Sequence, residues 1–246
     1  MTAAVRAEHL AAGYRFGEPV IRDVEFAADA GQAVAVLAPN GGGKTTLFRT
    51  LLGELPAAHG SFAVSGRVAS VPQHDHARLD FPVSALDVAL MGAYGRTPWW
   101  RRVARADRAA AREALRRVGL DDRADRHFGS LSGGQRRRVM IARAIVQDAR
   151  VLLLDEPFAG VDRSSEERIL AVLDELAAEG RTLLIATHDV EQSRRWDRVL
   201  CLNGRQVAFG TPEQTLTGPT LEATYGPELV VLREGAKGLT IQHHDH

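Results

Sequence analysis

The sequence predicts an α/β fold with an α-helical segment inserted into it. Two stretches predict the α/β part. Residues 34–52 combine an apolar strand, a glycine-rich loop and a helix, and residues 151–210 alternate between apolar strands and helices. Between them, residues 76–148 carry helical patterns. The core is therefore expected at residues 1–75 and 149–226, with residues 76–148 as a helical subdomain.

Composition limits what the protein can be. The chain has 246 residues, of which 45% are hydrophobic and 25% charged, as in a globular protein that buries a sizeable core. The formal net charge is zero, which gives no support to a protein that coats nucleic acid. The single cysteine, Cys201, excludes an internal disulfide framework and fits a reducing compartment. No signal peptide is evident and no stretch offers about 18 uncharged apolar residues, so any membrane role is expected to be peripheral.

The first third of the chain is expected to be mostly β. Short strands are predicted at residues 5–10 and, from an alternation of apolar and polar side chains, at residues 20–27. After the loop and its helix, residues 53–60 break the pattern. Two more short strands are predicted at residues 61–65 and 67–72.

The middle third is expected to be helical. One helix covers residues 81–91 and starts near Pro82 or Ser84, and another ends the segment at residues 134–146. Residues 105–118 form an amphipathic pattern, whose arginines most simply face solvent. Its expected apolar side carries Ala109, Ala110, Ala114, Leu115 and Val118, and its polar side carries Arg105, Arg108, Arg112 and Arg116.

The last third returns to alternating strands and helices. The uninterrupted apolar run 151–155 is typical of a parallel strand covered on both faces. The pair Asn203-Gly204 between two apolar runs predicts a hairpin. The tail, residues 227–246, is polar and expected to be partly disordered. The remaining expected elements are helices at 164–179 and 190–194, and strands at 182–187, 198–202 and 205–210.

The glycine-rich loop predicts a phosphate-binding site. Residues 39–43 (PNGGG) let backbone N–H groups surround an anion at the positive end of the following helix. Lys44 adds a positive charge and the Thr45 hydroxyl is placed to ligate a metal, so the expected ligand is a nucleoside triphosphate with Mg²⁺. The common pattern starts with glycine where this chain has Ala38, at a cost of about 1 kcal/mol if the backbone needs a positive φ. A plain glycine turn between a strand and a helix is the alternative.

The apolar strand VLLLDEP ends in two acids, Asp155 and Glu156. An acid at the carboxyl end of a parallel strand is expected beside the phosphate loop of the neighbouring strand. Asp155 would then hold Mg²⁺ through water, and Glu156 would act as general base toward the attacking water. A strand end that is acidic without a function is the alternative.

The stretch LSGGQ, residues 131–135, predicts a second anion site. Ser132 is placed to cap the following helix, and Gly133 and Gly134 expose backbone N–H groups. A capped helix start is the simpler interpretation. A second phosphate-binding element is useful only if it closes on a nucleotide held elsewhere, most simply by another copy of the chain.

Taken in order, the motifs resemble the ATP-binding cassette of ABC transporters, over residues 1 to about 225. The elements of that family occur here as APNGGGKTT, VPQ, LSGGQ, VLLLDEP, AGVD and ATHD. The resemblance implies a P-loop NTPase (RecA-like) core with an N-terminal antiparallel β subdomain and an inserted α-helical subdomain. The chain departs from the family at Ala38 and at Arg137, where a glutamine is common.

The resemblance also implies roles for single residues. Glu156 would be the base, and His188 would contact the γ-phosphate and the attacking water. Gln73 would sense the membrane partner, because it joins the core to the helical insertion. ATP binding is implied for Tyr14 (stacked on adenine), Asn40, Gly41, Gly42, Gly43, Lys44, Thr45, Thr46 and Gln73; Mg²⁺ binding for Thr45, Gln73 and Asp155; catalysis for Glu156, His188 and Lys44; and contact with the partner's ATP for Ser132, Gly133, Gly134, Gln135 and Asp162.

Within the family, the chain is most similar to ATPases of zinc, manganese or iron(II) importers, through FPVSALDVALMGAYG, Trp99-Trp100 and TGPTLEATYGPEL. This similarity implies a homodimer that sandwiches two ATP molecules at the cytoplasmic face of the membrane, with an integral membrane permease, an extracytoplasmic substrate-binding protein and no nucleic acid.

Three other functions stay open at this point. The first is an importer of haem or a siderophore, and the second is a nucleotide-binding module with little hydrolysis. The third is a non-transport cassette acting on ribosomes or DNA, which the single cassette and the lack of a coiled coil disfavour. The terminal histidines His243, His244 and His246 either bind a metal or belong to a disordered tail.

Overall fold

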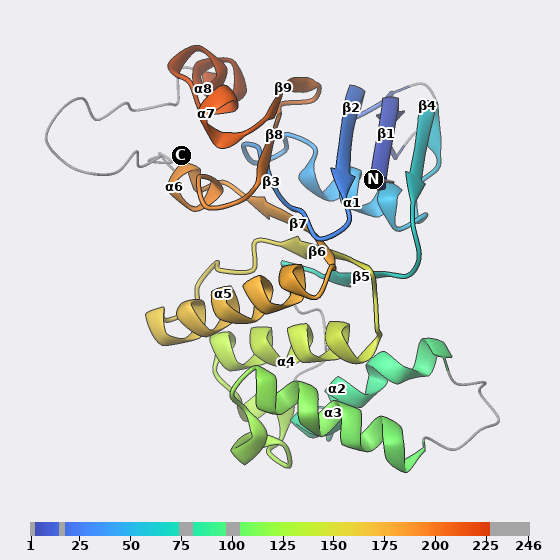
Figure 1. Cartoon of the computed structure of the whole chain (residues 1–246), viewed down its shortest axis with the longest axis vertical. Coiled ribbons are helices and arrows are strands. Elements are labelled where there is room, and N and C mark those ends of the chain that lie inside the picture. The colour runs from blue at the N-terminus through green and yellow to red at the C-terminus, as the bar shows by residue number, and fades with distance from the viewer. Residues whose placement is uncertain (1–2, 15–17, 74–80, 97–103, 227–246) are drawn as a thin grey trace, which may run out of the picture.

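The N-terminal part of the protein is a three-stranded antiparallel sheet in the order β2-β1-β4. The computed structural model describes residues 3–14, 18–73, 81–96 and 104–226 (Figure 1). The expected antiparallel β subdomain is therefore confirmed. Its strands are β1 (Ala3–Ala12), β2 (Ile21–Asp29) and β4 (Ala57–Val64).

Strand β4 starts at Ala57, so the prediction of a break through residue 60 was wrong. Ala57 pairs with Ala12 and His59 with Ala11, across an irregularity in the β1–β4 ladder. The first residues of β4 are largely exposed and show no apolar alternation, which left the sequence without a strand signal there.

A six-stranded sheet in the order β5-β6-β7-β3-β8-β9 forms the core. Its neighbouring strands are parallel, apart from the antiparallel pair β8–β9. That pair is the hairpin predicted from Asn203-Gly204, and Gly204 has a positive φ of 65°. The strands are β3 (Ala33–Leu37), β5 (Val68–Val71), β6 (Val151–Asp155), β7 (Thr182–Thr187), β8 (Arg198–Leu202) and β9 (Gln206–Gly210).

Alternate residues of the central strands face two different hydrophobic cores. In β3, Val34 and Val36 belong to one buried cluster, whereas Ala35 and Leu37 belong to the other. A strand that is buried on both faces has no polar side, which explains the continuous apolar runs in the sequence. The sheet thus separates two hydrophobic cores. Helix α1 (Lys44–Leu51) belongs to the core shared with the antiparallel sheet, and helix α5 (Arg163–Ala178) to the opposite one.

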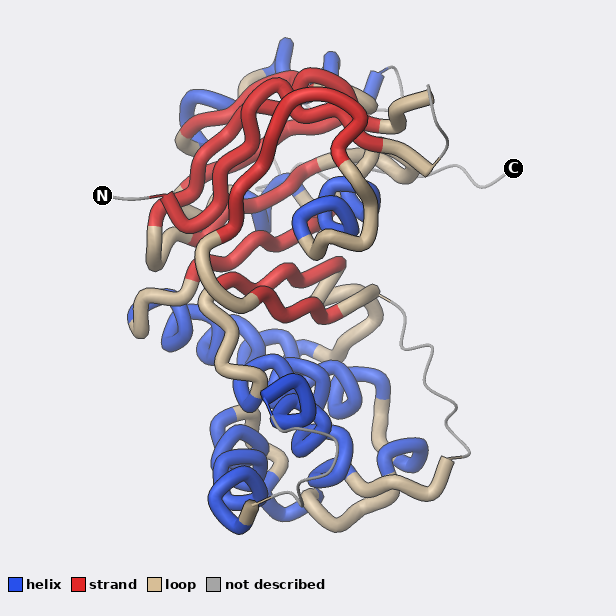
Figure 2. The backbone as a smooth tube through the Cα atoms, turned by 90° about the vertical axis from the view of Figure 1, so that its right-hand side faces the viewer, coloured by secondary structure: helices blue, strands red, loops and turns tan. Residues whose placement is uncertain are grey.

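Three helices between β5 and β6 pack against one another as a separate layer, below the strands in Figures 1 and 2. They are α2 (Ala85–Leu90), α3 (Arg105–Arg117) and α4 (Gly133–Val146), with 3₁₀ turns at Met91–Arg96, Asp121–Arg123 and Phe128–Ser130. Helix α2 begins after Ser84, whose side chain accepts a hydrogen bond from the Asp87 N–H in a capping box. This confirms Ser84 as the helix start.

The predicted apolar face of α3 was partly wrong. Ala109 and Ala110 are exposed, and the buried face consists of Ala111, Ala114, Leu115 and Val118. The spacing of these four, at i, i+3, i+4 and i+7, is the helical period, with which residues 109 and 110 are out of phase.

The C-terminal part carries two helices that the sequence reasoning did not place. They are α7 (Pro212–Thr215) and α8 (Gly218–Tyr225), and α6 (Val190–Ser193) was predicted. Thr211 and Thr217 precede them as N-caps, each followed by a proline in the first turn, and this signal could have found both helices. Within the described residues, no helix is long and apolar enough to cross a membrane. The tail and Trp99-Trp100 lie outside the described residues.

Candidate active site

The glycine-rich loop between β3 and α1 has the geometry of an anion cradle. Gly41 and Gly43 have φ values of 77° and 105°, and a side chain at Gly43 would also collide with Ile21. The N–H of Gly42 closes the turn on the carbonyl of Pro39 at 3.0 Å. The N-cap of α1 is Gly43, which has no side chain to cap the helix, so the first N–H groups of α1 are available to an anion.

Ala38 fits its position without backbone strain. Among the described non-glycine residues, a positive φ occurs only at His9, Asp23, Asp148 and Glu156. Ala38 therefore does not have the positive φ that would cost about 1 kcal/mol. The side chain is fully buried, and the carbonyl of Ala38 accepts a hydrogen bond of 2.7 Å from Lys44 Nζ.

Five side chains from three places in the sequence converge at the carboxyl ends of the strands. Lys44 Nζ lies 3.4 Å from Glu156 Oε1, and Thr45 Oγ1 donates to Asp155 Oδ2 at 3.4 Å. His188 Nδ1 lies 3.0 Å from both carboxylate oxygens of Glu156. Lys44, Asp155 and Glu156 are nearly buried, whereas about half of the His188 side chain is exposed.

The prediction that the acidic strand neighbours the strand before the phosphate loop was wrong. Strand β7 lies between β3 and β6, and it ends at Thr187, directly before His188. The order of strands in a sheet does not follow their order in the chain, so the sequence did not reveal that β7 lies between β3 and β6. As a result, Lys44, His188 and the two carboxylates follow three adjacent strands.

The backbone of Glu156 is left-handed, with a φ of 47°. This conformation costs a non-glycine residue about 1 kcal/mol and persists only where the surroundings fix it. Here the Glu156 N–H donates to the carbonyl of Ala186 in β7 at 3.0 Å, and the Glu156 carbonyl accepts from Ala159 at 3.1 Å. In this backbone conformation the carboxylate contacts Lys44 and His188.

A cavity of about 300 Å³ opens beside these groups. It brings together most of the predicted ATP-binding residues and Pro39 of the predicted loop, and Val20 lines it as well, although no sequence signal marked that residue. Tyr14 is half-exposed at its mouth, with the Arg49 guanidinium 5.3 Å from its ring centre. The lining residues are Tyr14, Val20, Pro39, Asn40, Gly41, Gly43, Lys44, Thr45, Thr46, Gln73, Asp155 and Glu156.

The LSGGQ stretch lies outside this cavity and forms the start of α4. Ser132 Oγ accepts from the Gln135 N–H at 3.3 Å, and Gln135 Oε1 accepts from the Ser132 N–H at 3.1 Å. This capping box confirms Ser132 as the N-cap. Within the described part of the chain, no residue from 132 to 135 lines the cavity that holds Lys44.

The LSGGQ stretch packs against the N-terminus of α5. A side chain at Gly134 would come within 2.6 Å of Ser165 Oγ, so only glycine fits there. Asp162 caps α5 and accepts hydrogen bonds from the Ser165 N–H at 2.9 Å and from the hydroxyls of Ser164 and Ser165. The Ser164 hydroxyl and these other donors hold the pKa of Asp162 far below its usual range.

The sequence profile of ABC transporters matches residues 21–159, more than half of the chain. The chain belongs to the ABC transporter family. ATP hydrolysis is the activity of this ABC ATPase, and ATP is its nucleotide.

Three relatives document the similarity. The manganese transport system ATP-binding protein MntB of Bacillus subtilis is 40% identical over 88% of this chain and 90% of its own length. The zinc transport system ATP-binding protein TroB of Treponema pallidum is 41% identical over 91% of this chain and 87% of its own. The solved structure of a protein described as an inward-facing, metal-chelate type ABC transporter superposes with a TM-score of 0.84, at 32% identity, over 92% of this chain and 89% of that one.

The cavity of this ABC ATPase offers donors that suit Mg²⁺ with a nucleotide. Asp155, Thr45 and Gln73 supply one carboxylate, one hydroxyl and one amide from its lining. Mg²⁺ prefers one or two protein oxygens and completes its shell with water and phosphate oxygens. Burial, and then the neighbouring charge of Glu156, raise the pKa of Asp155, so a cation in this place would offset an unfavourable charge.

We expect His188 to make the stability of the nucleotide-free protein depend on pH. Its hydrogen bond to Glu156 raises the pKa of His188 above 6.5, the ordinary value. The stabilisation is then complete below pH 6.5 and is lost as the pH rises through the raised pKa. Urea unfolding of the wild type and a His188→Ala variant should show a larger difference at pH 6 than at pH 8.5. A difference that is the same at both pH values would contradict a charged His188 in the folded state.

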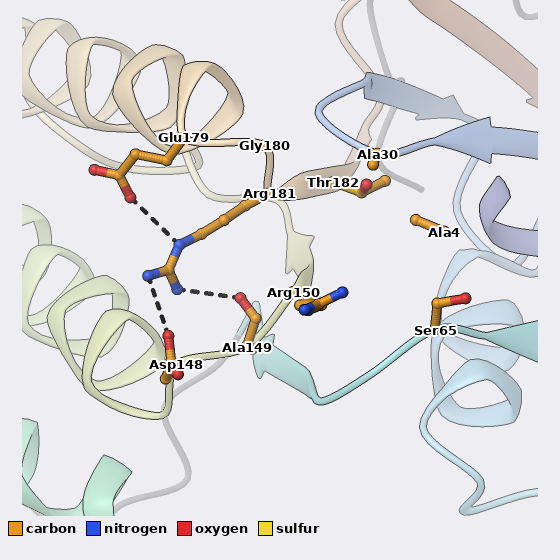
Figure 3. Close-up of a pocket in the computed structure, with 10 residues that line it drawn as sticks. All are labelled: Ala4, Ala30, Ser65, Asp148, Ala149, Arg150, Glu179, Gly180, Arg181 and Thr182. Carbon is orange, nitrogen blue, oxygen red and sulfur yellow. Dashed lines mark hydrogen bonds and ion pairs between the residues drawn. The ribbon is translucent and has the colours of Figure 1, made fainter. Parts of the chain in front are cut away.

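A second, larger cavity of about 520 Å³ lies at the opposite ends of the strands (Figure 3). Arg181 in its wall contacts Glu179 at 3.4 Å, Asp148 at 3.5 Å and the carbonyl of Ala149 at 3.1 Å. Ligands of open α/β sheets bind at the carboxyl ends of the strands, whereas this cavity lies where β6 and β7 begin. Its two acids and two arginines also balance in charge, so we interpret it as a structural junction between the two sheets.

Proposed function

We propose that this ABC ATPase energises the uptake of a divalent metal ion, with zinc and manganese as the leading candidates, through a partner permease. The observation that carries the metal assignment is the 40–41% identity, over nearly the whole chain, to ATP-binding proteins named for manganese and zinc transport. The protein would work at the cytoplasmic face of the membrane, with an extracytoplasmic substrate-binding protein in the same system and without nucleic acid.

In this proposal the side chains that converge on Glu156 perform the hydrolysis. Glu156 accepts a proton from the attacking water, and His188, hydrogen-bonded to Glu156, orients that water and contacts the γ-phosphate. Lys44 leaves the carbonyl of Ala38 to bind the β- and γ-phosphates, together with the backbone of residues 40–46. Mg²⁺, held by Thr45, Gln73 and Asp155, would neutralise phosphate charge when bound. Tyr14 stacks on the adenine.

Two copies of the chain would complete two such sites. The support for a homodimer is that Ser132, Gly133 and Gln135 are wholly or partly accessible, yet lie outside the cavity of their own chain. The N-terminus of α4 would then provide N–H groups to the partner's ATP. Asp162, which packs beside Gly134, would connect the two sites. In the same proposal, residues 1–75 and 149–226 form the core, and residues 76–148 form the helical part, which faces the permease.

The decisive experiment is transport by the reconstituted system. The chain is purified with the permease and binding protein of its gene cluster, placed in proteoliposomes and supplied with ATP. Uptake of zinc, manganese, iron–siderophore and haem is compared. We expect uptake of a divalent ion that stops without ATP. Uptake of a chelate alone would instead favour the second candidate, a metal-chelate importer, which the 32% identical solved relative suggests. Uptake of none of the four would contradict the proposal.

A further inference from the structure

Three consecutive arginines on α4 make three different connections. Arg136 donates to the carbonyl of Leu131 at 2.8 Å, and Arg138 donates to that of Val118 at 3.1 Å. Both of these bonds stay within the helical layer. The guanidinium of Arg137 instead reaches the core, where Nη1 donates to the carbonyl of Pro72 and Nη2 to the carbonyl of Gln73.

The connection made by Arg137 ends at the wall of the nucleotide cavity. Pro72 and Gln73 follow directly after β5, and Gln73 lines the cavity beside Asp155. Both residues are exposed, so burial in the core does not fix them. A planar guanidinium has donors in a fixed fork and holds two successive carbonyls with two separate nitrogens, whereas the ammonium of a lysine would share one nitrogen between them.

Arg137 connects the helical layer to one of the three candidate Mg²⁺ ligands, because it binds the backbone carbonyl of Gln73. It lies on the helix whose first residues belong to LSGGQ.

We propose that Arg137 is a positioning residue, which fixes the backbone of Gln73 and so couples the helix that carries LSGGQ to the Mg²⁺ site of the same chain. This inference rests on the proposed role of Gln73 as an Mg²⁺ ligand. A movement of α4 relative to the core would move the Gln73 backbone with it. The site would then bind Mg²⁺ well only when the helical layer is correctly placed.

The test measures nucleotide binding and needs no hydrolysis. The affinity for a fluorescent, non-hydrolysable ATP analogue is determined with Mg²⁺ and with EDTA, in Arg137→Ala, Arg137→Gln, Arg137→Lys and the control Arg116→Ala. Arg116 is an exposed arginine of the same layer, paired with Glu113. In Arg137→Ala we expect the gain in affinity on adding Mg²⁺ to be about tenfold smaller, because removing a residue that supports a metal ligand typically has an effect of this size. The affinity in EDTA should stay unchanged.

The other variants separate geometry from charge. Glutamine is shorter than arginine by two bonds and has a single amide nitrogen, so it should lose about as much of the Mg²⁺ effect as alanine, whereas lysine keeps the charge but not the fork and should restore only part of it. Hydrogen exchange of residues 68–73 without nucleotide should be faster in Arg137→Ala than in Arg116→Ala. If Arg137→Ala does not fold, the comparison of glutamine with lysine still decides. Full rescue by lysine, or equal losses with Mg²⁺ and with EDTA, would overturn the inference.

A double-mutant cycle separates this inference from the proposal on which it rests. If Gln73→Ala also loses the Mg²⁺ effect, Arg137→Ala should add little in that background, because the arginine acts through Gln73. Independent, additive losses would overturn the coupling but leave Gln73 as a ligand. A Gln73→Ala variant with an unchanged Mg²⁺ effect would instead remove the ligand role of Gln73 itself.

Discussion

Replacing Glu156 by glutamine is expected to lower ATP hydrolysis by about 10²–10⁴-fold, the usual contribution of a general base. The amide has the shape of the carboxylate but cannot accept the proton of the attacking water at neutral pH. It can still accept a hydrogen bond from Lys44, so ATP binding should remain within a few-fold of the wild type. Phosphate release and equilibrium binding of a fluorescent ATP analogue measure the two effects separately.

The matched control for this variant is Glu191→Gln. Glu191 lies on α6 and pairs with Arg194 on the surface at 3.2 Å, so the same chemical change is made without touching the cavity. Its hydrolysis rate should equal that of the wild type. If Glu156→Gln turned over ATP as fast as this control, Glu156 could not be the base, whatever its contacts with Lys44 and His188.

Replacing Lys44 by methionine should weaken ATP binding by about 100-fold. The variant keeps most of the aliphatic chain and removes a charge that would otherwise bond phosphate oxygens, and hydrogen bonds to charged groups contribute about 1.5–3 kcal/mol each. It also removes the ion pair of Glu156 with Lys44 and leaves its contact with His188, so the nucleotide-free protein should melt earlier. Isothermal titration with ATP, beside a thermal melt, distinguishes weaker binding from unfolding.

Arg194→Met provides the control for Lys44→Met, since it removes an exposed cation of the Glu191 pair. Exposed pairs contribute about 0.2–1 kcal/mol, so this control should bind ATP normally. Normal affinity in Lys44→Met would show that the loop backbone alone holds the phosphates. That result would shift the proposed role of Lys44 from binding to its ion pair with Glu156.

Much of the fold was predictable because its signals are local. The continuous apolar runs at β6 and β7 and the Asn203-Gly204 hairpin each depend on neighbouring residues, and the structure confirms them. The order of the strands was not predictable, because it is decided by packing between distant segments. Only the structure shows that β7 lies between the strands that lead to Lys44 and Glu156.

In the candidate site, too, the residues marked by local motifs were predictable, and the contacts between distant segments were not. Lys44, Glu156 and His188 were singled out by their residue types and motifs, and the structure places Lys44 and His188 within 3.4 Å of Glu156, while their roles stay predictions. The connection of Arg137 to Gln73 and the bond from the Tyr225 hydroxyl to the His188 carbonyl, at 3.2 Å, join segments far apart in the chain. The sequence marked Arg137 only as a departure from the family, and no pattern indicated which carbonyl either side chain would meet.

The position of β7 also restricts which side chain can occupy position 44. Strands β3 and β6 are separated by two strand spacings, about 10 Å, and Lys44 is the first residue of α1, beyond the loop that follows β3. Its side chain reaches back to the carbonyl of Ala38 at 2.7 Å and to Glu156 Oε1 at 3.4 Å. A histidine at position 44 is too short to do so, and an arginine carries a wide planar head into a nearly buried space. The order of the strands thus selects lysine by its reach and slender shape as well as by its charge.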